Sequence, residues 1–576
     1  MKNPLPGGNV RRAVAVAGLL AIPLLTVVAY APALRAGFVW DDDAHVVNEE
    51  SLRGLRGLAR IWLKPGATCQ YYPVTFTGFW IQYRLWGLNP KGYHAVNVAL
   101  QAANALLLWM LLLRLGFLGA WAAAAIFALH PLHAMSVAWI TELKNVLSLF
   151  LGLIASLLFF ALPVDFRGGR SRLLLGLSLA FFSLALLAKT AVASLPLGWL
   201  LALWWKRDIE YRDGIRLLPF FVLAVAAGLA TVLFEQMSVF APKERLTLRL
   251  GERVVLAGHA FWFYLGKFLW PRGLSFTYPR WSTTLADWRN LAWVAATIAA
   301  LAGAWSLRQR LGRGPFAALA FFFVAGPAIV LIHTLYMMQY TPVANHWAYV
   351  AGIAIIAPAV HLAARFSGRI GRAAGIVPAT LALAALIPLT FGATRTYANV
   401  ETLWRETLSR NPGCILSLNN LGLICTENGR AVEAIGLFRR AIESDPSFGK
   451  LHHNLGNALV RVGNLEDGLK AYRRAIEIRP DYVAAHRSLA TALIRARRFA
   501  EAADALRAAL RYAPGDVAFH NDLGACLIQS GRFQEAEAPL SEALRLDPQS
   551  EITRRNLQAV RSALLRGAGM NQGAPR

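Results

Sequence analysis

Cysteine is scarce in this sequence, and the usual motifs of soluble enzymes are missing. The four cysteines show no metal-ligand or CxxC spacing and leave the redox compartment open: Cys69, Cys414, Cys425 and Cys526. No HExxH motif and no Walker loop occurs, which argues against a zinc hydrolase of that type and against direct use of ATP. Acidic residues are also few, with 33 Asp and Glu against 59 Lys and Arg.

Apolar residues, in contrast, are abundant. They make up 56% of the chain, and they fall in blocks of about 20, the length that crosses a bilayer. The net charge of +26 could suggest a nucleic-acid partner. Many of the basic residues, however, stand in short loops between apolar blocks, as orientation in a membrane requires. We therefore expect a polytopic membrane protein, in contact with membrane lipid, that binds no nucleic acid.

The hydrophobic pattern predicts about eleven spans. They are Ala13–Leu34, His94–Leu113, Phe117–His133, Leu143–Leu162, Leu173–Ala188, Val192–Trp205, Ile215–Glu235, Leu291–Leu307, Phe316–His333, Trp347–Ala364 and Ala374–Ala393. The first reads as a retained signal-anchor helix, because no clear cleavage site follows it. The basic loops place the N-terminus in the cytoplasm. If Val254–Trp270 crossed the membrane, the basic loop around Arg308 would lie on the opposite side from the other basic loops. We therefore predict an interfacial or re-entrant helix at Val254–Trp270.

A short acidic stretch, Trp40–Asn48, follows the first span. Three consecutive carboxylates at the edge of a membrane are costly, although a solvated loop would also explain them. In the surrounding segment, Leu52–Leu63 and Phe76–Leu88 have apolar residues at helical spacing and suit the membrane surface. Further ionisable residues face the same compartment under this topology: His130, His133, Glu142, Lys144, Lys189 and Arg253.

Together these groups suit transfer of a sugar from a lipid phosphate. A carboxylate can deprotonate a Ser or Thr hydroxyl while cations hold the phosphate leaving group. Other readings stay open for the single residues. Each cation could instead extend its charged end to the membrane interface. His130 and His133 could simply form hydrogen bonds at the end of a span. Asp with His can also ligate a divalent cation, so the metal requirement stays open.

The C-terminal part contains a repeat of 34 residues. Prolines mark its period: Pro412, Pro446, Pro480, Pro514 and Pro548. This period, with small residues at helix crossings, is typical of tetratricopeptide repeats. We predict four full repeats, with helices such as Ala431–Ser444 and Leu465–Ile478, led by a helix around Glu401–Ser409 and closed by one around Glu551–Leu565. The concave face of such a solenoid is expected to hold a protein or peptide, although a dimerisation or architectural role is the alternative.

Several motifs, in order, resemble those of a known family. They are Phe38-Val39-Trp40-Asp41-Asp42, Tyr72-Pro73-Val74, Gly92-Tyr93-His94-Ala95-Val96-Asn97, His130-Pro131-Leu132-His133, Val137-Ala138-Trp139-Ile140, Lys189, and Tyr264 with Trp270-Pro271 and Leu274-Ser275. With the repeats, they resemble TMTC-like (transmembrane and tetratricopeptide repeat) proteins of the GT-C glycosyltransferase superfamily, which are related to protein O-mannosyltransferases. The resemblance covers nearly the whole chain.

The resemblance implies a protein O-glycosyltransferase that uses a polyprenyl-phosphate sugar, such as a mannose donor. Asp41 and Asp42 then form the catalytic acidic pair, with Asp41 as the base. The residues expected around the donor phosphate or the acceptor are His130, His133, Lys144, Lys189 and Arg253. Further candidates are Asp43, His45, Tyr72, His94 and Glu142. The Lys189-Thr190 pair departs from the expected Lys-Glu, so an acidic role at position 190 is not supported.

We therefore expect an all-α protein with two domains. Residues 1–394 form a GT-C-like membrane domain with outer loops at 35–93 and 236–288, and residues 395–576 form the repeat domain. Residue usage and the lack of an endoplasmic retention signal favour the bacterial inner membrane, with the repeats in the periplasm. Two other functions stay open: a non-enzymatic membrane scaffold for envelope proteins, and a polymerase or ligase of lipid-linked glycans.

Overall fold

The structure is a computed structural model that describes residues 8–163, 168–238, 248–332, 338, 340–370 and 373–571. It divides into two compact units, residues 1–412 and 413–576. Within the described ranges the chain forms helices joined by turns and loops, which confirms the all-α class. The predicted domain boundary at 394/395 falls before the division between the units.

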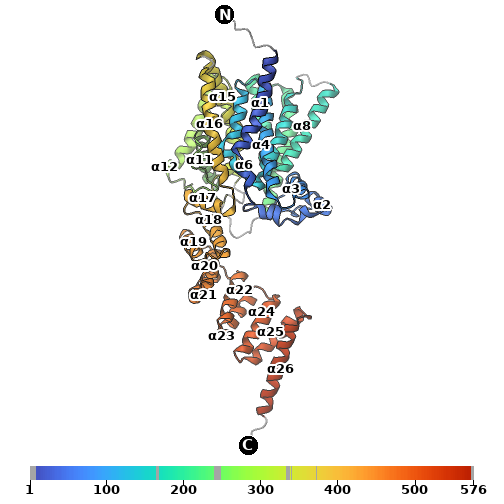
Figure 1. The fold of residues 1–576 in the computed structure, drawn as a ribbon, viewed down its shortest axis with the longest axis vertical. Helices are drawn as coiled ribbons and strands as arrows, with labels where there is room; N and C mark the ends of the chain where they lie inside the picture. Colours follow the sequence, from blue (N-terminus) through green and yellow to red (C-terminus); the bar gives the residue numbers. More distant parts are fainter. Residues whose placement is uncertain are drawn as a thin grey trace. The chain divides into compact units, whose positions relative to one another are not determined.

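The first unit is a bundle of long helices (Figure 1). Its α-helices are α1 (Gly8–Ala29), α2 (Leu55–Leu63), α3 (Pro73–Trp86), α4 (Pro90–Arg114), α5 (Ala120–Leu129), α6 (Ala134–Ala138), α7 (Leu143–Phe160), α8 (Gly169–Ala188), α9 (Leu195–Lys206), α10 (Tyr211–Ser238), α11 (Leu250–Leu269), α12 (Trp288–Ser306), α13 (Arg308–Leu311), α14 (Gly314–Ala325), α15 (Gly352–Ile370), α16 (Ala373–Arg395) and α17 (Val400–Arg410).

Five helical stretches of this unit are long and apolar enough to cross a membrane. They are Pro90–Arg114, Ile140–Phe160, Gly169–Ala188, Tyr211–Phe234 and Gly375–Arg395. A sixth arises if the bent pair Ala120–Leu129 and Pro131–Ala138 is one span, and three shorter apolar helices lie at Val16–Ala29, Gly314–Ala325 and Gly352–Gly368. A multi-pass membrane protein follows. Each of the eleven predicted spans overlaps an α-helix, but the count of eleven crossings stays a prediction.

Two predicted spans are interrupted by proline. The stretch from Phe117 is helical only to Leu129, because Pro131 follows and the helix pair is bent by 48° there. The stretch from Phe316 ends as an α-helix at Ala325, before Gly326 and Pro327, where a 3-10 turn begins. The predicted end of that span lies outside the described residues. These breaks place irregular backbone and polar side chains inside the bundle.

Short helices cover one end of the bundle (Figure 1). The acidic stretch forms one turn of π-helix at Asp43–Val47, and α2 and α3 follow it. The two predicted surface helices correspond to α2, with the 3-10 turn before it, and to α3. The segment predicted as a long outer loop contains the 20-residue helix α11, and its interfacial or re-entrant placement stays a prediction.

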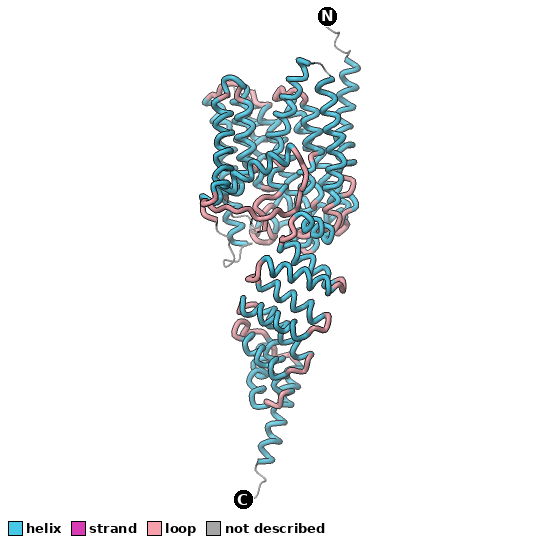
Figure 2. Tube along the Cα trace, turned by 90° about the vertical axis from the view of Figure 1, so that its left-hand side faces the viewer, coloured by secondary structure: helices cyan, strands magenta, loops and turns pink. Residues whose placement is uncertain are grey.

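The second unit consists of stacked helix pairs (Figure 2). Its helices are α18 (Ile415–Glu427), α19 (Ala431–Ser444), α20 (Gly449–Arg461), α21 (Leu465–Ile478), α22 (Val483–Arg495), α23 (Phe499–Leu510), α24 (Val517–Gln529), α25 (Phe533–Leu546) and α26 (Glu551–Asn571). A Cβ added at Gly422 would lie 2.6 Å from the ring of Phe438, and at Gly456 it would lie 2.5 Å from that of Tyr472. Glycine therefore sets the close approach of the two helices in a pair.

Candidate active site

The carboxylate of Asp42 joins the acidic stretch to the start of α7. The backbone N–H of Val39 donates to Oδ2 over 2.7 Å, and the N–H and hydroxyl of Thr141 donate to Oδ1 over 2.8 and 2.5 Å. The side chain is fully buried, and burial raises its pKa to about 7 although all three hydrogen bonds act in the opposite direction. Asp42 therefore positions the loop.

The neighbouring carboxylate of Asp41 has different surroundings. It makes no hydrogen bond within the part of the chain that the structure describes, and its side chain is partly exposed. Burial raises its pKa to about 6, which nearby Lys144 lowers and nearby Glu142 and Asp43 raise. A carboxylate with that pKa and free oxygens is suited to accept a proton near neutral pH.

Trp40, directly before Asp41, has an unusual backbone conformation. Its φ of 46° lies in the left-handed region, which costs a bulky residue ~1–3 kcal/mol. The indole stacks on Trp139, with ring centroids 5.8 Å apart, and meets the rings of Phe276 and Trp404 edge-on at 5.2 and 5.7 Å. These three rings come from distant parts of the first unit and hold the strained residue in place.

A buried carboxylate and two lysines lie at the start of α7. Glu142 is fully buried, and its oxygens lie 3.0 Å from Nζ of Lys189 and 3.4 Å from Nζ of Lys144. The amide of Asn145 donates to Glu142 over 2.5 Å and also to the carbonyl of His346 over 3.2 Å. Glu142 thus holds both ammonium groups in fixed positions, and Lys144 lies close to Asp41.

Gln70 completes this cluster, and no sequence motif pointed to its role. Its Oε1 accepts from Nζ of Lys144 over 3.2 Å and lies 3.4 Å from Nε2 of His45. Nδ1 of His45 lies 2.8 Å from the backbone oxygen of Asp41, to which it donates, and the ring stacks on Phe76. Burial lowers the pKa of His45 to about 4, so the neutral ring supports the backbone of the candidate base.

The predicted histidine pair makes its contacts elsewhere in the unit. Nε2 of His130 donates to the carbonyl of Phe268 over 3.1 Å, and its Nδ1 accepts from the N–H of Leu132 over 3.2 Å. His133 donates from Nδ1 to the carbonyl of Phe127 over 2.8 Å, and its buried Nε2 has no hydrogen-bond partner among the described residues. The contacts of both rings stabilise the break between α5 and α6, and a role at the donor stays a prediction.

The remaining candidates lie around the site or apart from it. Arg253 donates to the carbonyls of Leu248 and Leu331, over 2.9 and 3.3 Å, and so joins α11 to the turn after α14. Tyr72 is buried at the start of α3, whereas Asp43 is exposed. His94 is buried on α4, with Nε2 3.4 Å from the carbonyl of Gly37. No set of three or more His, Cys, Asp or Glu side chains within the described ranges is grouped to hold a metal ion.

Comparisons with known proteins agree with both parts of the prediction. A tetratricopeptide repeat family model matches residues 400–447, 453–507 and 487–551. Over 193 residues, the chain is 32% identical to "Protein O-mannosyl-transferase Tmtc1" of Drosophila melanogaster, a match to 31% of this chain and 22% of that protein. It is 29% identical over 161 residues to "Protein O-mannosyl-transferase F38B6.6" of Caenorhabditis elegans, covering 26% of this chain and 23% of that one.

The matches thus span less than a quarter of either relative. Among solved structures, the MamA protein is 19% identical with a TM-score of 0.25, and the alignment covers 26% of this chain and 81% of MamA. The chain is therefore similar to TMTC-type proteins and carries a C-terminal tetratricopeptide repeat region, as the sequence motifs indicated.

Proposed function

We propose that this protein is a membrane glycosyltransferase that moves a sugar from a polyprenyl-phosphate donor to a Ser or Thr hydroxyl of a protein. The supporting observation is the carboxylate of Asp41, whose oxygens accept no hydrogen bond from the described residues and lie near a lysine pair held by Glu142. A hexose such as mannose is the proposed sugar, because both relatives are named protein O-mannosyl-transferases.

In the proposed reaction, Asp41 takes the proton of the acceptor hydroxyl as that oxygen bonds to the anomeric carbon of the sugar. The bond from this carbon to the phosphate oxygen breaks, and the electron pair leaves with the polyprenyl phosphate. Lys144 and Lys189 stabilise the growing negative charge on the phosphate. Glu142 keeps these cations in position before the donor arrives, so that little reorganisation is needed during the reaction.

A pocket next to these lysines could hold the lipid chain of the donor. It has a volume of about 110 Å³ and lies between the loop before α3 and the helices α8 and α10. Gln70, which accepts from Lys144, and Thr190, which follows Lys189, both line it. The other walls are mostly apolar and include Leu186, Leu187 and Phe234. A lipid chain in this pocket would place its phosphate beside the two ammonium groups.

We further propose that the tetratricopeptide repeats bind the acceptor protein, and that the acidic stretch and the repeats lie in the periplasm of a bacterium. The repeat match supports a protein-binding role, since concave helical solenoids bind extended peptides and other proteins. The basic loops support a cytoplasmic N-terminus.

The test uses the full chain in lipid vesicles with a polyprenyl-phosphate hexose and a Ser/Thr-rich acceptor. Asp41→Asn is compared with Asp43→Asn, a matched control at an exposed carboxylate. Intact-mass analysis of the acceptor is expected to show a hexose-sized gain with wild type and with Asp43→Asn, and none with Asp41→Asn. Equal transfer by Asp41→Asn would contradict the proposal.

The same assay separates the two alternatives. A non-enzymatic scaffold would bind its partner and give no mass gain with any variant. A glycan polymerase or ligase would add sugar to a lipid-linked glycan and leave the protein mass unchanged.

A further inference from the structure

A large apolar cavity lies far from the acidic stretch, at the opposite end of α7. Lys144 is near the start of this helix and Phe160 is its last residue, so the two are about 24 Å apart at 1.5 Å per residue. Phe160 lines the cavity, together with parts of α4, α9, α14 and α15. The cavity therefore cannot be part of the proposed active site.

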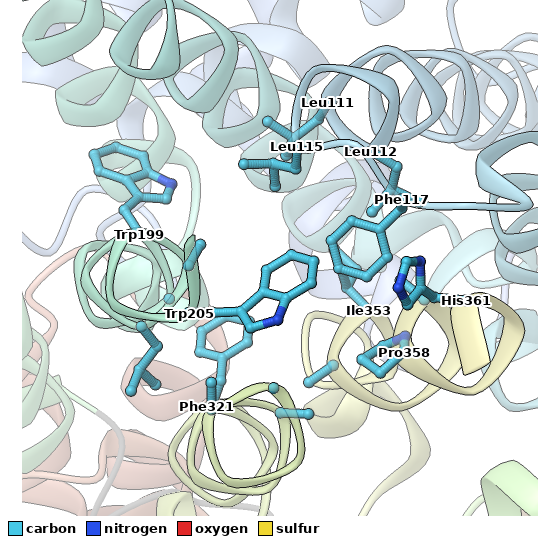
Figure 3. A pocket seen from close by; sticks show the side chains of 18 of the residues that line it. Leu111, Leu112, Leu115, Phe117, Trp199, Trp205, Phe321, Ile353, Pro358 and His361 are labelled. Atoms are coloured by element: carbon cyan, nitrogen blue, oxygen red, sulfur yellow. The ribbon is translucent and has the colours of Figure 1, made fainter. Parts of the chain in front are cut away.

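The walls of this cavity are mostly apolar. Figure 3 shows Trp199, Trp205, Phe117 and Phe321 around the same space. The hydroxyl of Ser156, also in the wall, donates to the carbonyl of Gly152 over 2.7 Å and accepts from Nε1 of Trp199 over 2.9 Å. Since this hydroxyl is already satisfied, it has little need of water. A mostly apolar cavity in a membrane protein favours a hydrocarbon occupant.

The cavity is long and narrow. Its lining follows α15 from Ile353 to Arg365 and α9 from Leu195 to Trp205, which corresponds to about 18 and 15 Å along the two helices. The volume is about 260 Å³. An elongated cavity of this volume suits part of one acyl chain.

Positive charge lies at the end of the cavity formed by the last turn of α9 and the part of α15 around Arg365. Arg365 lines the cavity one helical turn beyond His361, and Lys206 stands over the ring of Trp205, with Nζ 4.2 Å from its centroid. Both cations lie close to His361, whose Nδ1 accepts from the N–H of Leu118 over 2.8 Å. No Asp or Glu is among the described residues that line the cavity. The charge at this end is therefore complementary to a phosphate.

We infer that this cavity binds one acyl chain of an anionic phospholipid, with the phosphate between Lys206 and Arg365. The bound chain fills the space between α9, α14 and α15 and joins these helices. The inference does not depend on the proposed sugar transfer, because it concerns another end of the bundle and another lipid.

The test is photocrosslinking of the full chain in vesicles that contain a phosphatidylglycerol with a diazirine near the end of one acyl chain. Peptide mapping is expected to place the crosslink on cavity residues of α9, α14 or α15. Ala202→Phe, which fills the cavity from α9, is expected to abolish this crosslink. A crosslink confined to other surfaces of the bundle, or one unchanged in Ala202→Phe, would overturn the inference.

A second measurement tests the charged end without filling the cavity. Lys206→Gln with Arg365→Gln is expected to weaken retention of phosphatidylglycerol about thirtyfold, since each basic side chain near an anionic lipid adds roughly fivefold. Retention is measured by mass spectrometry of lipid that remains after delipidation. Arg310→Gln, an exposed arginine outside the lining, is the control and should retain the lipid. Unchanged retention in the double variant would contradict the assignment.

Competition for the crosslink shows whether the cavity binds a phospholipid, free phosphate or a polyprenyl phosphate. Inorganic phosphate should not reduce the crosslink, because the acyl chain contributes to binding. Phosphatidylethanolamine should compete poorly. Displacement by an equal amount of a polyprenyl phosphate would show that the cavity takes a prenyl chain and would also overturn the inference.

Discussion

The hydroxyl of Thr141 lies 2.5 Å from Oδ1 of Asp42, although 99 residues separate them in the sequence. Asp41, the preceding residue, has no such partner in the described parts of the chain. Two adjacent carboxylates therefore have different roles: Asp42 fixes the loop on α7, and Asp41 is left with oxygens that can take a proton. The proposal predicts that stability depends on Asp42 and that sugar transfer depends on Asp41, and the two effects can be measured separately.

Asparagine at position 42 should destabilise the protein. In Asp42→Asn, an NH₂ group replaces one of the two carboxylate oxygens. This donor must then face another donor, either the N–H of Val39 or the N–H and hydroxyl of Thr141. A buried donor without an acceptor costs about 1–3 kcal/mol. Asp41→Asn disrupts no hydrogen bond among the described residues and removes a carboxylate whose ionisation burial disfavours, so this variant should be at least as stable as wild type at neutral pH. Denaturant unfolding in detergent, followed by circular dichroism, compares the two variants. Equal losses of stability would contradict the division of roles.

Sugar transfer should depend on pH through Asp41. Its pKa is raised by burial to about 6, so the carboxylate is protonated, and inactive as a base, below that pH. We expect kcat/KM to fall about tenfold per pH unit below pH 6. The effect of pH on stability has the opposite sign. The folded state binds this proton more tightly than the unfolded chain, so protonation of Asp41 stabilises the fold at low pH. This stabilisation is lost as the pH rises from 3.8 through about 6.

The pH profile of Asp43→Asn is the control for this assignment. Asp43 is exposed, and its removal should leave the acid limb close to its wild-type position, shifted slightly downward because Asp43 raises the pKa of Asp41. An acid limb near pH 4 in the wild type would mean that another carboxylate is the base.

Removal of the Glu142 charge should be costly. The side chain is 1% exposed and lies against Lys144 and Lys189, so Glu142→Gln removes the buried carboxylate that both ammonium groups contact. Loss of one partner of a buried ion pair costs about 3–5 kcal/mol. Adding Lys189→Met should recover part of this loss, which unfolding of the single and double variants would reveal. No recovery would show that the ion pair is not the cause.

An exposed ion pair provides the comparison. Glu406 lies 3.5 Å from Arg410 on α17, and both side chains are more than one-third exposed. Glu406→Gln should change the free energy of unfolding by about 0.5 kcal/mol or less.

Two glycines of the first repeat should respond oppositely to alanine. At Gly422 the new Cβ would lie 2.6 Å from the ring of Phe438, so the helices of the pair must move apart, at a cost of about 1–3 kcal/mol. At Gly436, on α19, the Cβ would meet no atom within 4 Å, and the higher helix propensity of alanine should stabilise the repeats by up to ~1 kcal/mol. Thermal unfolding of the two variants measures the difference, and equal shifts would refute the packing role.

Sequence periodicity was sufficient for the repeats. Helices were predicted at Ala431–Ser444 and Leu465–Ile478, and the structure has the same bounds, because turn residues and prolines recur every 34 positions. Local pattern was less informative in the membrane part. Pro131 indicates a possible break, but pattern alone does not tell whether a span bends there or continues.

The sequence predicted which charged residues belong to the candidate site, but it did not predict which residues contact one another there. Asp41, Lys144 and Lys189 stood out because charge near an apolar span is rare. Gln70 did not stand out, since a glutamine in a loop has no periodic or charge signal. The roles of Asp42 and His130 also depend on partners far along the chain, Thr141 and Phe268, which a single sequence does not reveal.

The left-handed backbone of Trp40 has one more consequence. Its indole is in edge contact with Trp404, which belongs to α17, and the second unit begins three residues after this helix ends. A displacement of α17 would loosen the ring cluster and let Trp40 relax toward ordinary backbone angles. Since the next residue is Asp41, that relaxation would turn the carboxylate. A single side chain, that of Trp40, thus stands between the helix that leads into the repeats and the proposed base Asp41.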